Sequence, residues 1–323
     1  SSMLALGVFP QSHPLSMGFM GMYGHAYANY AALESDFIVA IGCSFNDRLV
    51  MSSKQSFCPN ATKVHIDIDP YEFNKVVDCD LTIAGDAKAV LQKLLVLIEK
   101  QDRKAWVSKA ATLKQKFSLS YEDDQQVRMP YVIDILYKQT KGEAIMVTDV
   151  GMHQIWAAQY YALEYPGRWI SSCGAGTMGY GLPAAIGVQL ASKEALVVAI
   201  VGDGGFQMME CELATLALNK LPIKIIVMDN AHLGMVLQLQ ELVHLEAPEA
   251  VDLSGNPDFV QLATSYGVEA YTIDKADTAV AIIKRALAYN EGPCLIHVKL
   301  DEKENVYPII KPGGGLEEMI FHD

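Results

Sequence analysis

Short apolar runs alternate with helical segments along most of this chain. The clearest example begins with an apolar run rich in β-branched residues at 196–201, which breaks at a glycine turn. A helical segment at 206–219 follows, and a second apolar run at 223–228 ends at Asp229 and Asn230. This order of strand, turn, helix and strand predicts a βαβ unit whose two strands run parallel.

The same alternation continues on both sides of that unit. Further strands are predicted at residues 36–41 (buried), 64–69, 81–84, 144–148, 169–171 and 294–300. Helices are predicted at residues 25–33, from 87 through 98, at 131–139, from after His153 to about 163, and at 257–266. Successive strands separated by crossovers predict the α/β class, with mostly parallel sheets flanked by helices.

A charged, lysine-rich stretch divides the chain. Residues 101–124 carry Trp106, Leu113 and Phe117 at roughly helical spacing, which predicts an amphipathic connecting helix and then a linker. A chain of 323 residues is long enough for two domains. We therefore predict an α/β domain at 1–100, a connecting segment at 101–128 and a second α/β domain at 129–323.

The composition indicates which kinds of partner and which cellular compartment fit this protein. A formal net charge of −13 argues against nucleic acid or an anionic membrane as a partner. No apolar run approaches the ~20 residues of a membrane span, and the N-terminus lacks the pattern of a signal peptide. The six cysteines are scattered without a CxxC pair. This usage predicts reduced thiols and a cytoplasmic protein.

Two polar side chains follow the two strands of the central unit. Parallel strands release their last residues at the same carboxyl edge, so Asp203 and Asn230 are expected side by side. A carboxylate oxygen, an amide oxygen and the backbone carbonyl of His232 would suit Mg²⁺. Gly204 and Gly205 let the backbone approach a phosphate at a helix N-terminus. Gly-Asp-Gly alone is also a common turn, so the prediction of a Mg²⁺-bridged diphosphate depends on the pairing with Asn230.

Two other motifs suggest dinucleotide binding and also have other interpretations. Residues 174–179 form a literal G-x-G-x-x-G after a strand, which is typical of an NAD site with Asp203 as the ribose acid. An NAD site needs neither a second glycine turn around that acid nor an Asn partner. Asp67 and Asp69 end another strand, where a dinucleotide fold would hold a ribose. They are equally well explained as ordinary loop-facing acids.

The Gly-Asp-Gly and Asn pair resembles the thiamine diphosphate signature. Further motifs lie at residues 21–24, 27–30, 45–48 and 65–69, and at 150–159, 176–185, 232–236, 305–308 and 317–320. Through these motifs the chain resembles, nearly from end to end, the large catalytic subunits of acetohydroxyacid synthase, also called acetolactate synthase. The first group resembles the middle domain of that family, and the second resembles its diphosphate-binding domain and tail.

The resemblance implies a set of site residues. Asp203, Asn230 and the carbonyl of His232 would bind Mg²⁺. Contacts to the cofactor would come from Gly151, His153, Gly176, Gly202, Gly204, Gly205, Leu233 and Gly234. Met178 would be the apolar wedge beneath the thiazolium and Met235 would flank the aminopyrimidine, although Met178 is also explained as a packing residue. Arg48, Asp67 and Asp69 would help bind FAD in a structural role.

The activity implied by the resemblance is decarboxylation of pyruvate on thiamine diphosphate. The resulting enamine condenses with a second 2-ketoacid, which forms 2-acetolactate for branched-chain amino acid biosynthesis. The family also implies a homodimer or homotetramer and a regulatory small subunit. The chain departs from the usual pattern of the family at several positions. Met152 stands where the family usually has Gln, Leu239 stands where it usually has Trp, and Ser44 stands at a commonly basic position. These departures bear on the choice of the acceptor ketoacid and on the binding of the flavin.

The family begins with a pyrimidine-binding domain that carries the activating Glu, and this chain starts part-way into the middle domain. We therefore expect the isolated chain to be inactive. Alternatives are another thiamine enzyme, such as a pyruvate oxidase or glyoxylate carboligase, an NAD-binding oxidoreductase, or a non-catalytic fragment that contributes part of a site to a partner.

Overall fold

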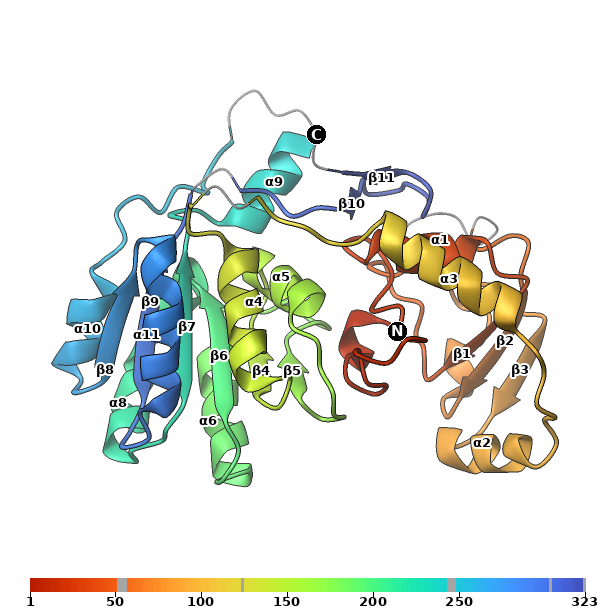
Figure 1. Cartoon of the computed structure of the whole chain (residues 1–323), viewed down its shortest axis with the longest axis horizontal. Coiled ribbons are helices and arrows are strands. Elements are labelled where there is room, and N and C mark those ends of the chain that lie inside the picture. The colour runs from red at the N-terminus through yellow and green to blue at the C-terminus, as the bar shows by residue number, and fades with distance from the viewer. Residues whose placement is uncertain (51–56, 123–124, 243–247, 302–303, 322–323) are drawn as a thin grey trace. The chain divides into compact units, whose positions relative to one another are not determined.

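The computed structural model describes residues 1–50, 57–122, 125–242, 248–301 and 304–321. They form two compact units, each with its own parallel sheet (Figure 1). The first comprises Ser1–Met3, Pro14–Leu119 and Tyr307–Asp323, and the second comprises Leu4–His13 and Ser120–Val306. The domain boundaries expected at residues 100 and 128 stay predictions. Asp124, where the amphipathic segment was predicted to end, lies outside the described residues.

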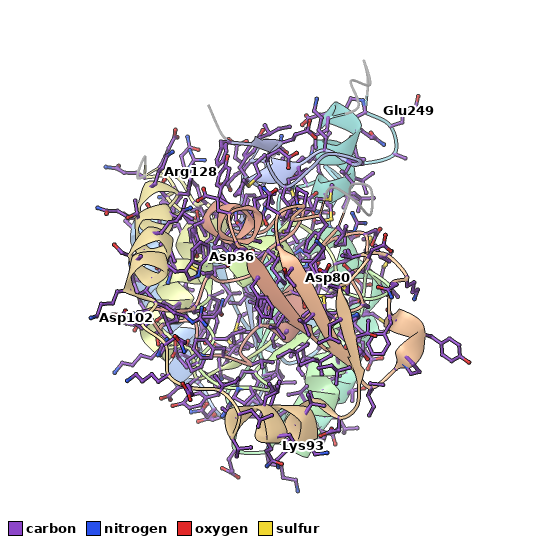
Figure 2. All side chains as sticks on the ribbon, turned by 90° about the vertical axis from the view of Figure 1, so that its right-hand side faces the viewer. Asp36, Asp80, Lys93, Asp102, Arg128 and Glu249 are labelled. Carbon is purple, nitrogen blue, oxygen red and sulfur yellow. The ribbon has the colours of Figure 1, made fainter. Side chains whose placement is uncertain are left out.

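The first unit contains a sheet of three parallel strands. These are β1 (Phe37–Ile41), β2 (Thr62–Asp67) and β3 (Leu81–Ala84), in the order β1-β2-β3. Asp36 and Asp80 directly precede β1 and β3 and lie near the ends from which those strands start, while Lys93 lies on α2 (Ala87–Leu95) (Figure 2). The three predicted strands are confirmed, with β2 starting and ending two residues earlier than expected.

The prediction that the first strand is buried is wrong for one of its two faces. Phe37, Val39 and Ile41 are 56%, 42% and 41% exposed, whereas Ile38 and Ala40 pack against the core of the unit. Alternate side chains of a strand point to opposite faces. Among the described residues of this unit, the core covers one face of β1 and leaves the other open.

Helices and a hairpin complete the first unit. The helix α1 (Ala26–Leu33) packs beside α3 (Lys104–Lys116), where Tyr30 and Phe117 stack with ring centroids 4.6 Å apart. The α3 helix confirms the predicted amphipathic helix. Strands β10 (Ile309–Ile310) and β11 (Met319–Ile320) pair antiparallel, and η2 (Pro70–Glu72) is a single turn of 3₁₀ helix. A further 3₁₀ turn, η1 (Met3–Ala5), spans the point at which the chain passes from the first unit to the second.

The second unit contains a six-stranded parallel sheet in the order β5-β4-β6-β7-β9-β8. Its strands are β4 (Ile145–Thr148), β5 (Trp169–Ser171), β6 (Val197–Gly202), β7 (Lys224–Asp229), β8 (Glu269–Ile273) and β9 (Cys294–Lys299). Every pair of neighbours is parallel, which confirms the predicted α/β class. The pattern of the sequence missed β8.

Helices cover both faces of this sheet (Figure 1). On one face lie α4 (Met129–Thr140), α5 (Met152–Tyr160) and α11 (Ala276–Ala288), and on the other lie α6 (Gly181–Ala191), α8 (Leu213–Leu218) and α10 (Phe259–Ser265). The side chains of alternate residues of β6 point to opposite faces of the sheet. Those of Val197, Ala199 and Val201 belong to the core on the α6 side. The α9 helix (Gly234–Leu242) follows β7.

The helix predicted at 206–219 is broken into pieces. The α7 helix (Asp203–Met208) begins at Asp203 itself, and η3 (Glu210–Glu212) separates it from α8. The break allows Phe206, Leu213 and Leu216 all to be fully buried in one core. Because α7 starts directly after β6, Gly204 and Gly205 belong to its first turn.

Two expectations from composition can be checked on the structure. All six cysteines are free thiols, as predicted. No helix in the described part of the chain combines the length and the apolar composition that a membrane crossing requires.

The α8 helix offers a matched test of the core. Leu216 is fully buried, whereas Leu218 on the same helix is 84% exposed. Leu216→Ala is expected to destabilise the protein by about 2–5 kcal/mol, because it leaves a cavity as well as losing buried apolar surface. Leu218→Ala should change stability by less than about 0.5 kcal/mol. Urea unfolding followed by circular dichroism measures both, and equal shifts would contradict this packing.

Candidate cofactor and metal site

The order of strands creates a switch point beside β4. The strand that follows β4 in sequence, β5, lies on one side of it, and the next strand, β6, lies on the other. In open α/β sheets, ligands bind outside the carboxyl ends of the strands at such a point. The segments that follow β4, β6 and β7 therefore meet where a ligand is expected.

A cavity of about 280 Å³ lies at this edge. The predicted site residues of this unit all line it: Gly151, His153, Gly176, Met178, Gly202, Asp203, Gly204, Gly205, Asn230, His232, Leu233, Gly234 and Met235. The remaining lining residues are Met129, Val150, Met228 and Val236, for which the sequence predicted no role, and Met152 and Leu239, which depart from the family pattern. The fold thus gathers the predicted residues around one cavity whose lining combines polar groups with apolar side chains.

The glycine turn after β6 is packed so closely that side chains would not fit. A Cβ atom on Gly205 would lie 2.1 Å from Oδ2 of Asp149, and one on Gly204 would lie 2.9 Å from Cδ2 of Leu233. Such separations are shorter than van der Waals contact. Both positions therefore require glycine, and the turn is bare in the sense that Gly204 and Gly205 line the cavity without side chains.

Asp149, which the sequence prediction did not include among the site residues, is a fully buried carboxylate at the end of β4. Its Oδ1 accepts a hydrogen bond from Nε2 of His153 at 2.6 Å, and its Oδ2 accepts one from the backbone N–H of Gly179 at 2.9 Å. These bonds fix the imidazole ring of His153 beside the cavity. The signal available in the sequence was an acid directly after a strand and four residues before a histidine.

The bonds of the G-x-G-x-x-G loop bear on the NAD interpretation. The N–H of Gly179 is directed to Asp149, and the N–H of Thr177 donates to Oγ of Ser172 at 2.7 Å. Two amides of the loop are thus used inside the protein. Gly176 and Met178 of the same loop line the cavity beside Asp203. This geometry favours one shared site over a separate dinucleotide site.

Asp203 has the properties of a metal ligand. It is 3% exposed, its Oδ1 accepts a hydrogen bond from the N–H of Gly204 at 2.9 Å, and its Oδ2 accepts one from Nδ2 of Asn256 at 2.9 Å. The pKa of Asp203 is raised to about 7, chiefly by burial and also by the charge of Asp229, against the effect of these two bonds. A cation at Asp203 would offset this penalty on the ionised form.

Asn230 and the turn after it supply further oxygens. None of the described residues forms a hydrogen bond with the side chain of Asn230, so its amide oxygen is available. Ala231 has a left-handed backbone with a φ of 55°, and its carbonyl accepts from the N–H of Leu253 at 2.7 Å. This turn sets the position of the backbone of His232 at the cavity.

The donor set fits a hard cation. Within the described residues, no cluster of three or more His, Cys, Asp and Glu side chains could hold a metal. A metal at this cavity would therefore also need amide and backbone oxygens, such as those of Asn230 and His232. Oxygen donors with few charges are typical of Mg²⁺ sites that share the ion with substrate phosphates.

The residues predicted for the flavin lie in the first unit and make local bonds. Oδ1 of Asp67 accepts from the N–H of Asp69 at 2.9 Å, and Oδ1 of Asp69 accepts from the N–H of Tyr71 at 3.0 Å. The backbone carbonyl of Arg48 accepts from the N–H of Met22 at 2.8 Å. These bonds show that Asp67 and Asp69 stabilise the turn after β2. Their role in binding a flavin stays a prediction.

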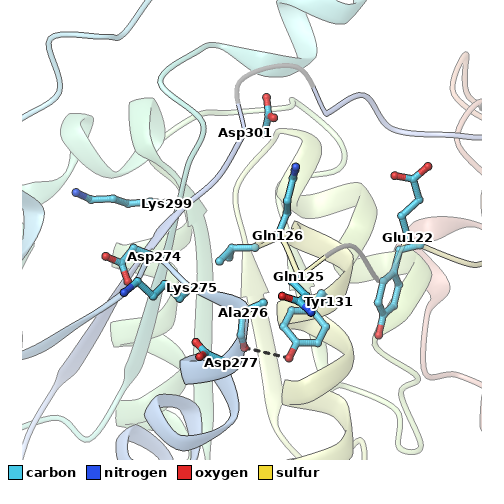
Figure 3. Close-up of a pocket in the computed structure, with 12 residues that line it drawn as sticks. Glu122, Gln125, Gln126, Tyr131, Asp274, Lys275, Ala276, Asp277, Lys299 and Asp301 are labelled. Atoms are coloured by element: carbon cyan, nitrogen blue, oxygen red, sulfur yellow. Dashed lines mark hydrogen bonds between the residues drawn. The ribbon is translucent and has the colours of Figure 1, made fainter.

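A larger cavity of about 700 Å³ opens at the carboxyl ends of β8 and β9 (Figure 3). Its charged lining consists of Glu122, Asp274, Asp277 and Asp301, with Lys275 and Lys299. None of the predicted cofactor or metal residues lines it. An excess of carboxylates disfavours a diphosphate, so size alone does not identify the cofactor site.

Comparison with known proteins agrees with this geometry. Residues 149–298 match the C-terminal TPP binding domain of thiamine pyrophosphate enzymes, and residues 1–94 match the central domain of the same enzymes. The chain therefore belongs to the thiamine pyrophosphate enzymes. The predicted resemblance to this class is confirmed, and the NAD interpretation loses its support.

Relatives within that class include acetolactate synthases. The chain is 38% identical to the acetolactate synthase isozyme 2 large subunit of Escherichia coli (strain K12), over 98% of this chain and 57% of the relative. It is 39% identical to the chloroplastic acetolactate synthase 1 of Oryza sativa subsp. japonica, over 99% and 52%. Identity to a probable acetolactate synthase large subunit of Methanocaldococcus jannaschii is also 39%, over 99% and 55%. The chain spans about half the length of these relatives.

The close packing of the glycine turn can be tested by adding a methyl group. Gly205→Ala should destabilise the protein by about 1–3 kcal/mol, because the new Cβ displaces Asp149 from its bonds. Gly187→Ala is the control, since a Cβ there meets nothing within 4 Å and Gly187 lies within α6. The control should gain about 0.5–1 kcal/mol. Thermal unfolding measures both, and a neutral Gly205→Ala would contradict the packing.

Proposed function

We propose that this chain is the diphosphate- and metal-binding portion of an acetolactate synthase large subunit. In this function a protein that contains the chain decarboxylates pyruvate and joins the product to a second 2-ketoacid. The observation that carries the proposal is the single cavity at the carboxyl ends of β4, β6 and β7, which the predicted site residues line together. The acetolactate synthases among the relatives support the same assignment.

In the proposed site, Asp203, Asn230 and the carbonyl of His232 hold Mg²⁺, and the bare turn at Gly204 and Gly205 receives the diphosphate. Thiamine diphosphate, when bound, supplies the electron sink that a 2-ketoacid needs in order to lose carbon dioxide. The residues of this chain bind and orient that group. They leave the chemistry itself to the cofactor.

His153 has a defined role in this arrangement. Because a carboxylate accepts hydrogen bonds, the proton between His153 and Asp149 belongs to Nε2. Nδ1 is the ring nitrogen that this bond leaves for a ligand in the cavity that His153 lines.

The apolar side chains that line the cavity would hold the rings of the cofactor and exclude water. Met178 and Met235 line it as the proposed wedge and flanking residue, together with Leu239 and Met152. Met152 lies close to the backbone at Gly234, since a Cβ there would be 2.4 Å from its sulfur. Met152 therefore fills space where the family usually has a polar contact to the diphosphate. Leu239 is smaller than a Trp would be, so it leaves more room on the acceptor side.

Further features of the proposed enzyme rest on the resemblance to the family. They are a flavin contacted by Arg48, Asp67 and Asp69, a homodimer or homotetramer, a regulatory small subunit and a cytoplasmic location. The relatives named as large subunits support the small subunit.

Calorimetric titration of thiamine diphosphate tests the proposal. We expect Mg²⁺ to strengthen the binding, and we expect Asp203→Ala to abolish this Mg²⁺-dependent binding, because the loss of the charged ligand removes the metal. The effect should exceed the about 10–100-fold loss that changes in supporting residues cause at metal sites.

Asp274→Ala is the matched control, since Asp274 lies at the end of β8 and lines the larger acidic cavity. It should bind as the parent chain does. Binding that is independent of Mg²⁺, or that Asp203→Ala leaves unchanged, would refute the metal assignment.

A further inference from the structure

Asn256 connects two carboxylates behind the proposed metal site. Its Nδ2 donates to Oδ2 of Asp203 at 2.9 Å and to Oδ1 of Asp229 at 2.8 Å. Its Oδ1 accepts from Nε2 of Gln207 at 2.7 Å. Carboxylates accept hydrogen bonds, so the NH₂ group must face both acids and the bond from Gln207 fixes the same orientation. Both donors and the acceptor of this side chain are therefore used.

The second carboxylate is itself anchored. Oδ2 of Asp229 accepts from Nε2 of His297 at 2.7 Å, and Oδ1 accepts from the N–H of Ala231 at 3.0 Å as well as from Asn256. His297 lies on β9 and is 5% exposed. An Asn at this position would offer one acceptor oxygen to these three donors. The Asp at 229, where the family usually has Asn, is thus matched by Asn256 and His297.

Asn256 forms a bridge between Asp203 and Asp229, and this bridge determines the orientation of the Asp203 carboxylate. Each of the two oxygens of Asp203 accepts one bond, from the N–H of Gly204 and from Asn256, and each keeps a lone pair. The carboxylate group cannot rotate without losing one of these bonds. Asn256 also places a donor between two acids that would otherwise repel each other. It does not line the cofactor cavity, so it acts on that cavity through Asp203.

We propose that Asn256 is a positioning residue for the metal, which holds the carboxylate of Asp203 in its ligating orientation by tying it to Asp229. This inference rests on the proposed function, because it takes Asp203 as a ligand of Mg²⁺. It adds a residue on the segment before α10 to a site otherwise formed by the ends of β4, β6 and β7.

The test measures the dissociation constant of Mg²⁺ at a saturating concentration of thiamine diphosphate, by calorimetry on the full chain. Asn256→Ala and Asn256→Leu should each weaken Mg²⁺ binding by about 10–100-fold, as supporting residues do at metal sites. Asn219→Ala is the control, since the side chain of Asn219 bonds to the carbonyl of Thr215 in its own helix. It should bind Mg²⁺ as the parent does.

Gln207→Ala is the second variant, in case loss of Asn256 prevents folding. It keeps the bridge but removes the bond that orients it, and a smaller loss of about 3–10-fold is expected. Thermal midpoints without ligands identify any variant that fails to fold. Weak binding of thiamine diphosphate without the metal should be the same in every folded variant.

Mg²⁺ binding within twofold of the parent in both Asn256 variants and in Gln207→Ala would overturn the inference, even where Asp203→Ala abolishes binding. Equal losses with and without Mg²⁺ would also overturn it, because they indicate a general collapse of the cavity. If Asp203→Ala itself has no effect, the proposed function fails instead. The two failures are therefore distinguishable.

Discussion

Two carboxylates buried at the ends of neighbouring parallel strands govern the local structure of the site. Asp149 follows β4 and Asp203 follows β6, and both are almost completely buried. A buried charge is costly unless it is paired or hydrogen-bonded. Asp149 meets this requirement within the protein, through His153 and Gly179. Asp203 meets this requirement only in part. Its raised pKa shows that burial still penalises the ionised form, and a bound cation would offset that penalty.

The difference between the two acids separates their functions. Asp149 has a strong bond on each oxygen and holds the loops after β4 and β5 together, so it is a structural anchor for His153. Asp203 keeps a free lone pair on each oxygen at the wall of the cavity. The glycine turn beside it and the methionines that line the same cavity suit a ligand that has one charged end and one apolar end. Thiamine diphosphate is such a molecule.

The sequence predicted the parts of this site that depend on strand order. Asp203 and Asn230 follow adjacent parallel strands, so their proximity followed from topology alone. It did not predict Asn256 or His297, because their bonds to Asp229 depend on how distant segments fold back over the sheet. Likewise, the break between α7 and α8 and the open face of β1 depend on which side chains reach a core. Those are tertiary effects that local pattern does not encode.

The position of the metal is the most direct test of this account. A crystal structure of the chain with thiamine diphosphate and Mn²⁺ in place of Mg²⁺ would locate the ion by its anomalous scattering. The account predicts one peak within ligating distance of Asp203, Asn230 and the carbonyl of His232. A peak in the acidic cavity beside Asp274 and Asp301, or a diphosphate bound there, would contradict it.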